Sequence, residues 1–116
     1  MANLKIYHNP RCSKSRQTLK LLKSKVKNFE IIEYLKTPLQ VNEIKLILSK
    51  LDSKAIEIIR KQEPVWKNNY LNKDISEEEI IDIISKHPKL MERPIVTNKK
   101  KAIICRPPER VLTLFN

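Results

Sequence analysis

The chain has 116 residues, the length of one domain, and a chain of this size buries roughly two thirds of its unfolded surface. Its 24 lysines and arginines outnumber 13 acidic residues and give a net charge of +11, and it contains no glycine. Without glycine it has neither a phosphate-binding loop nor the glycine motif of dinucleotide-binding domains. No apolar run approaches the ~20 residues of a membrane span, so we expect no membrane partner. The N-terminus lacks the apolar region of a signal peptide, so we expect a cytoplasmic protein.

An alternating segment over residues 4–9 predicts a strand at the start of the chain. Apolar residues at helical spacing predict a helix over 13–27, with Ser13 as its N-cap. A second β-rich segment covers 28–35. A strand, a helix and a strand at this spacing form a βαβ unit, which predicts a parallel strand pair.

The middle of the chain is predicted to be helical, from about residue 38 to about residue 90. The patterns predict a helix over 41–51, a short helix over 53–62, a loop or short helical turn over 63–72, and a helix over 76–87. Ser76 and Glu79 stand at the spacing of a capping box, which marks the start of the last of these helices.

Two short strands, over 94–96 and 101–105, are predicted around a hairpin turn in which Asn98 is a candidate for positive φ. A closing helix over 107–115 has a proline available for its first turn. The order β-α-β, helical block, β-β-α predicts an α/β fold with a thioredoxin-like mixed sheet and a helical insertion. We expect a single domain over 1–116, with the insertion at about 38–90.

The two cysteines, Cys12 and Cys105, are too few for the disulfide framework of a secreted protein, and we expect both to be thiols. Neither stands at a metal-ligand spacing from a histidine, so no metal site is predicted. Cys12 lies at a predicted strand-to-helix junction, between Arg11 and two basic residues. The helix N-terminus and these charges would lower the pKa of its thiol. From these residues alone, Cys12 is either a nucleophile or an ordinary small residue in a basic loop.

Ser15 stands where a redox CxxC motif has its second cysteine. A Cys12 adduct would therefore be resolved by Cys105, by another molecule, or by neither. Burial statistics of free cysteine favour a small buried residue at Cys105.

The positive charge admits two kinds of anionic partner, a nucleic acid or a small oxyanion. Lysines are spread along the whole chain with few aromatic residues, so a nucleic-acid-binding face is not predicted. The six arginines are placed differently, because most lie close to Cys12 or to a proline. Their planar guanidinium groups fit tetrahedral oxyanions in a bidentate manner, which favours the small oxyanion.

Three segments, IYHNPRCSKSRQTL, ERPIV and RPPERVL, resemble the glutaredoxin-coupled arsenate reductases of the ArsC family. The resemblance runs from residue 4 to about residue 114, in the family's order and spacing. It implies a thioredoxin-like fold with a helical insertion and assigns Cys12 as the nucleophile. It also implies that the oxyanion is bound by Arg60, Arg93 and Arg106, although the residues around Arg60 match weakly.

The resemblance extends to the loop around the nucleophile. It implies that His8 and Ser15 tune or position the thiolate and that Pro94 follows a cis peptide bond. The loop residues concerned are His8, Asn9, Arg11, Ser15 and Arg16.

In the implied reaction, the Cys12 thiolate attacks arsenate and forms a covalent S–As adduct, which glutathione and glutaredoxin reduce to arsenite. Glutathione would be a co-substrate, no bound cofactor is needed, and we expect a monomer. Two alternatives stay open. One is a glutathione-dependent thiol oxidoreductase of unknown substrate. The other is an Spx-type regulator of RNA polymerase, although such regulators use a CxxC switch and here Ser15 takes the second position.

Overall fold

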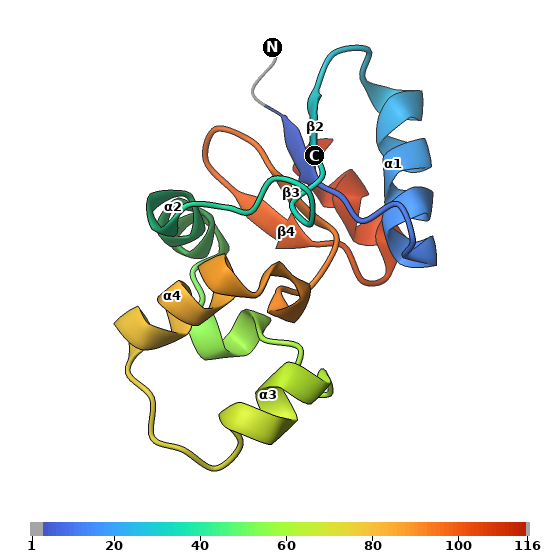
Figure 1. The fold of residues 1–116 in the computed structure, drawn as a ribbon. Helices are drawn as coiled ribbons and strands as arrows, with labels where there is room; N and C mark the ends of the chain where they lie inside the picture. Colours follow the sequence, from blue (N-terminus) through green and yellow to red (C-terminus); the bar gives the residue numbers. More distant parts are fainter. Residues whose placement is uncertain (1–3, 116) are drawn as a thin grey trace. The chain divides into compact units, whose positions relative to one another are not determined.

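The computed structural model describes residues 4–115 and divides the chain into two compact units (Figure 1). The first unit, here called the sheet unit, extends to Thr37 and resumes at Arg93. The second, here called the helical unit, is Pro38–Glu92. The predicted insertion covers about the same residues as the helical unit. That the two units form one domain stays a prediction.

The sheet unit contains four strands, β1 (Lys5–Tyr7), β2 (Glu30–Ile32), β3 (Ile95–Thr97) and β4 (Ala102–Ile104), in the order β2-β1-β3-β4. β1 and β2 are parallel, whereas β3 is antiparallel to both β1 and β4. In this register Ile6 of β1 lies between Ile31 and Val96 of its neighbours. The predicted mixed sheet is confirmed, with strands shorter than the sequence pattern suggests.

Helix α1 (Ser13–Lys25) and the closing 3₁₀ helix η3 (Pro108–Phe115) pack against each other (Figure 1). Between them and the sheet lies a core formed by Ile6, Leu22, Val96, Cys105 and Val111. All five side chains are fully buried. The loop that follows β1 leads directly into the N-terminus of α1.

Three local predictions in this unit need correction. The N-cap of α1 is Cys12 rather than Ser13, which is already the first helical residue. The closing helix is 3₁₀ rather than α, and the Arg110 N–H donates to the Pro107 carbonyl in the i→i+3 manner. Asn98 is not among the described residues with positive φ, because its Oδ1 accepts from two N–H groups of the following lysines and closes the hairpin turn without that conformation.

The helical unit contains α2 (Val41–Leu51), η1 (Ala55–Ile58), α3 (Pro64–Asn69), α4 (Glu77–Lys86) and η2 (Pro88–Leu90). α4 packs against α2, η1 and η2, and its isoleucines are buried. The bounds of α2 match the prediction, and the capping box of Ser76 and Glu79 is present. The segment expected as a short helix over 53–62 is the single 3₁₀ turn η1.

Candidate active site

The loop between β1 and α1 carries Cys12 and is closed by its own hydrogen bonds. The Cys12 N–H donates to the Asn9 carbonyl over 3.0 Å, and the Asn9 Oδ1 accepts from the Arg11 N–H, also over 3.0 Å. Asparagine side chains stabilise turns in this way, so the loop folds without glycine. It ends where the Cys12 carbonyl accepts the first helical hydrogen bond, from the Arg16 N–H.

Arg16 reaches back over the same loop. Its Nη1 donates to the Pro10 carbonyl over 2.9 Å. Arg16 thus bonds to two carbonyls of the loop, that of Pro10 through its side chain and that of Cys12 through its backbone N–H. The resemblance includes Arg16 among the loop residues but implies no role for it. In the structure its side chain bonds to the Pro10 carbonyl.

His8 and Ser15 form a buried pair beneath the loop. His8 Nδ1 lies 2.6 Å from Ser15 Oγ, and the same Oγ accepts from the Asn9 N–H over 3.0 Å. Burial lowers the pKa of His8 below 6.5, which favours the neutral ring at neutral pH. A neutral ring offers one nitrogen as an acceptor, so Ser15 can donate to His8 while it accepts from Asn9. The Ser15 side chain thus fixes the loop through His8 and Asn9.

Two opposing effects set the pKa of the Cys12 thiol. Burial is the largest single effect and raises the pKa. Hydrogen bonds from the backbone N–H groups of Ser15 and Lys14, together with the charge and a hydrogen bond of Arg93, outweigh burial and hold the pKa below its usual value. The helix N-terminus therefore acts as the sequence predicts. The basic side chains that act on the thiol are Arg93 and Arg106, which lie far along the chain and are not its basic neighbours in sequence.

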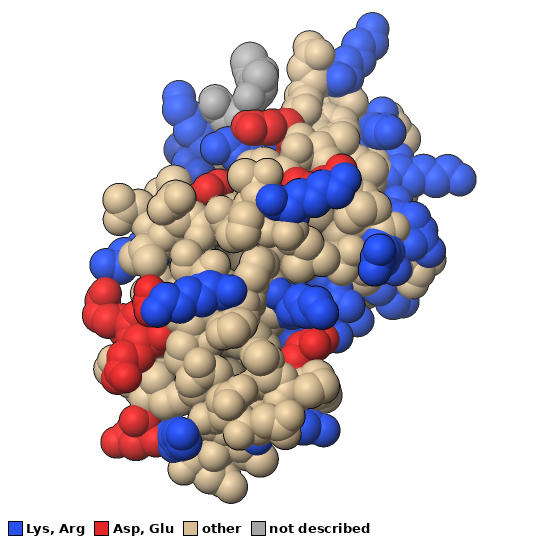
Figure 2. Space-filling model, in the orientation of Figure 1, with Lys and Arg blue, Asp and Glu red and all other residues tan. Residues whose placement is uncertain are grey.

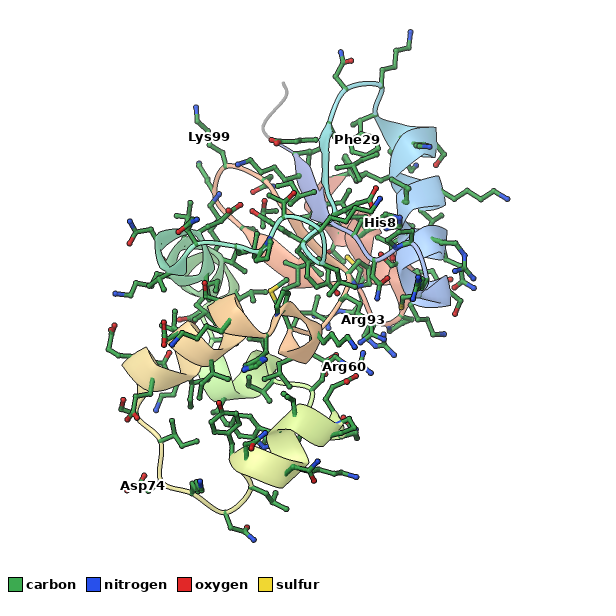
Figure 3. The ribbon with its side chains drawn as sticks, viewed as in Figure 1. His8, Phe29, Arg60, Asp74, Arg93 and Lys99 are labelled. Carbon is green, nitrogen blue, oxygen red and sulfur yellow. The ribbon has the colours of Figure 1, made fainter. Side chains whose placement is uncertain are left out.

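Arg93 and Arg106 come from the other end of the chain and lie on either side of the β3–β4 hairpin. The Arg106 Nη1 lies 3.9 Å from Cys12 Sγ and donates to the Arg93 carbonyl over 3.1 Å. The Nε of Arg93 is buried and has no hydrogen-bond partner within residues 4–115. The Arg93–Pro94 bond is cis, the geometry that the resemblance implies for Pro94, and Arg106–Pro107 is cis as well. His8 and Arg93 are labelled in Figure 3.

Cys105 differs from Cys12 in the exposure and in the pKa of its thiol, the two properties that govern thiol reactivity. It belongs to the core of the sheet unit, with no exposed surface, and burial raises the pKa of its thiol to about 12. Its Sγ donates to the Ile103 carbonyl over 3.6 Å. The expectation of a small buried residue is confirmed.

Arg60 belongs to the helical unit. Its backbone N–H donates to the Leu90 carbonyl over 2.7 Å, and its Nε lies 3.6 Å from Oε2 of Glu63 (Figure 3). The guanidinium is half-buried, so an oxyanion would have to compete with this carboxylate. Its part in oxyanion binding stays a prediction.

A metal centre and a membrane span each need a feature that residues 4–115 do not have. No three His, Cys, Asp or Glu side chains gather in a way that would hold a metal ion. None of the helices combines the length and the hydrophobicity of a membrane span.

A mixed sheet in this order, with a cysteine at the N-terminus of its first helix and a cis-proline before β3, is typical of thioredoxin-like proteins. The model of the ArsC family matches residues 7–114. The chain therefore belongs to the ArsC family.

Individual relatives agree with this assignment over nearly the whole chain. The uncharacterised protein YfgD of Escherichia coli (strain K12) is 46% identical over 113 residues, which are 96% of this chain and 95% of that protein. An arsenate reductase of Haemophilus influenzae is 45% identical over 112 residues, 95% of this chain and 97% of its own. The solved structure of an arsenate reductase from Vibrio cholerae has a TM-score of 0.91 at 38% identity and covers 97% of both chains.

Proposed function

We propose that this protein is an arsenate reductase with Cys12 as its nucleophile. The observation that carries the proposal is the arrangement of two guanidinium groups around one thiol. Arg106 lies 3.9 Å from Cys12 Sγ, and Arg93, which lowers the pKa of that thiol, has a buried Nε without a partner within the described chain. Buried donors are normally satisfied, so a free one beside a thiol favours an anionic ligand there. The names of the relatives support arsenate as that anion.

In the proposed binding mode, Arg93 and Arg106 hold two faces of the tetrahedral oxyanion, and the N–H groups at the start of α1 hold a third. Guanidinium groups bind such oxyanions through two parallel hydrogen bonds, and a helix N-terminus attracts negative charge. Arg60 is proposed as a third oxyanion-binding arginine on the family resemblance alone. The positive groups would also stabilise the charge that develops during attack.

The proposed reaction begins when the Cys12 thiolate attacks arsenic. An S–As bond forms, one arsenate oxygen leaves as water after taking up protons, and arsenic stays pentavalent. Two further thiols then supply one electron each. They leave as a disulfide, while arsenic becomes trivalent and is released as arsenite with the Cys12 thiol restored.

We propose glutathione as the first of these thiols and glutaredoxin as the second, with no bound cofactor on this chain. Cys105 is not suited to resolve the adduct, because it has no exposed surface and burial raises the pKa of its thiol. Ser15 is not suited either, since a hydroxyl cannot form the disulfide that this step requires.

The test is the formation of arsenite from arsenate in the presence of glutathione and glutaredoxin, with Cys12→Ser and Cys105→Ser as a matched pair. We expect turnover in the wild type and in Cys105→Ser, and none in Cys12→Ser. Turnover that survives in Cys12→Ser would refute the nucleophile. If the wild type forms no arsenite while Cys12 is alkylated rapidly, the remaining function is a glutathione-dependent thiol oxidoreductase with another substrate.

A further inference from the structure

The charge of this protein is concentrated in one of its two units. The sheet unit holds fifteen of the 24 lysines and arginines but three of the 13 acidic residues. The helical unit holds nine basic and ten acidic residues and is close to neutral. Lysine itself is evenly spread, as the sequence suggests, with ten in the sheet unit and eight in the helical unit, so the difference comes from the arginines and the acidic residues. The excess of positive charge belongs to the unit that carries Cys12.

Within the sheet unit, basic side chains form a row along α1. Arg16, Lys20 and Lys23 are spaced i, i+4 and i+7, so they share one helix face, and all three are exposed. Lys27 follows just after the helix and is exposed as well. We call these four residues the basic ridge. Over α1, at the right-hand edge of Figure 2, blue side chains gather without red ones among them.

Within residues 4–115, no carboxylate forms an ion pair with the basic ridge. The sequence contains no Asp or Glu between His8 and Phe29. Among the ion pairs of residues 4–115, none involves Lys20, Lys23 or Lys27. Three lysines elsewhere, Lys36, Lys45 and Lys86, are paired with carboxylates.

Most of the basic ridge does not stabilise the helix that carries it, whereas Lys23 lies in the last turn, where positive charge is favourable. Like charges three and four residues apart repel each other, and α1 has no acidic residue in its first turn, where one would be favourable. The arrangement therefore lowers the stability of the isolated helix. A partner of opposite charge would offset this repulsion.

We propose that the basic ridge is the docking surface for an acidic protein that brings a reducing thiol to Cys12. This inference rests on the proposed function, which requires such a thiol. The row begins at Arg16, whose N–H is bonded to the Cys12 carbonyl, and its helical part extends for about 10 Å along α1. A protein bound along the basic ridge would therefore place part of its own surface next to the Cys12 thiol.

A protein partner fits this face better than a nucleic acid does. Residues 9–28 contain no aromatic side chain on which a base could stack. A protein reductant, in contrast, has to approach the N-terminus of α1 to reach Cys12, and opposite charge accelerates and orients such an encounter.

The test variant reverses two charges of the basic ridge, Lys20→Glu together with Lys27→Glu. Arg16 is left unchanged because it donates to Pro10, and Lys23 because its charge acts on His8. The carboxylate introduced by Lys20→Glu would pair with Arg16 and Lys23, so α1 is expected to stay folded.

The matched control reverses the same amount of charge elsewhere in the sheet unit, with Lys99→Glu and Lys100→Glu. Both lysines are exposed in the β3–β4 turn, and Figure 3 shows Lys99 pointing away from α1.

The assay needs no arsenate and therefore separates the docking surface from the proposed function. Cys12 is first converted to its mixed disulfide with glutathione, and a glutaredoxin of negative net charge is then added. The glutaredoxin thiolate attacks the glutathione sulfur, the bond to Cys12 breaks, and Cys12 leaves as a thiolate, with no net oxidation. The second-order rate constant is measured by mass spectrometry at low and high salt, and arsenite formation is measured in parallel.

We expect the variant of the basic ridge to lose about tenfold in this rate constant at low salt, the lower end of electrostatic steering effects, and the control to change by less than about twofold. The wild-type rate should also fall with salt more steeply than that of the variant. Equal rates in the wild type and the variant would overturn the docking surface, even if arsenate is reduced. So would equal losses in variant and control, or tighter binding of a short DNA duplex than of glutaredoxin. A rate that depends on the basic ridge without arsenite formation would instead refute the arsenate chemistry alone.

Discussion

Replacing Ser15 by alanine tests whether the buried pair beneath the Cys12 loop holds that loop in place. The Ser15 side chain is fully buried, and its hydroxyl has two partners, His8 Nδ1 at 2.6 Å and the Asn9 N–H at 3.0 Å. Alanine has nearly the same size without the hydroxyl, so both partners lose their contact. Neither gains a water molecule unless the loop opens.

The expected loss of stability follows from these two contacts. A buried polar group left without a partner costs about 1–3 kcal/mol. Two such groups that share one hydroxyl are not independent, so we expect the free energy of unfolding to fall by about 2–4 kcal/mol. With a urea m-value of about 2 kcal/mol/M, the unfolding midpoint should fall by about 1–2 M.

Urea titration followed by circular dichroism measures this shift, and Ser24→Ala is the matched control. Ser24 lies on the same helix, but its side chain is exposed and donates to the Leu21 carbonyl. We expect its replacement to change stability by less than about 0.5 kcal/mol. If Ser15→Ala costs no more than Ser24→Ala, the buried pair does not hold the loop and the reasoning is refuted.

Three further predictions concern the charges of the site. Cys12 should react with iodoacetamide with an apparent pKa below that of a free thiol, ~8.5, because backbone N–H groups and Arg93 outweigh burial; a normal value contradicts this. Arg93→Lys should bind arsenate about tenfold more weakly in calorimetry, because lysine lacks the bidentate fork; unchanged affinity would remove the bidentate argument. Burial lowers the pKa of His8 below 6.5, so the unfolded chain binds more protons just below that pH. Urea midpoints should therefore fall as the pH drops through 6.5, less so in His8→Asn, and equal slopes would argue against a buried neutral His8.

Much of the architecture could be predicted because the signals are local. The bounds of α2 and the capping box at Ser76 follow from apolar spacing and from a side chain that bonds to its own helix. The strand and helix order, read with the motifs, gives the mixed sheet. Cys12 could be proposed as a nucleophile because a strand-to-helix junction has the same electrostatics in any fold.

What could not be predicted depends on contacts between distant segments. Nothing in the residues around Cys12 indicates that Arg93 lowers the pKa of its thiol, because that effect needs the β3 end of the sheet to return to the loop. The sequence predicts the N-cap one residue late because serine is a frequent cap, whereas here the side chain that stabilises the loop is Ser15. Asn98 closes its turn with its side chain instead of its backbone conformation, a choice that local propensity leaves open.

The absence of glycine has a consequence for the unfolded chain. Asp52, at the end of α2, and Asn72, after α3, have φ of 55° and 63°. Glycine adopts positive φ without steric cost, whereas a residue with a Cβ atom is strained there. The native protein bears this strain at both positions. In the unfolded chain, however, no residue has the wide conformational freedom of glycine. Folding therefore removes less backbone entropy than it would from a chain with glycine at such turns.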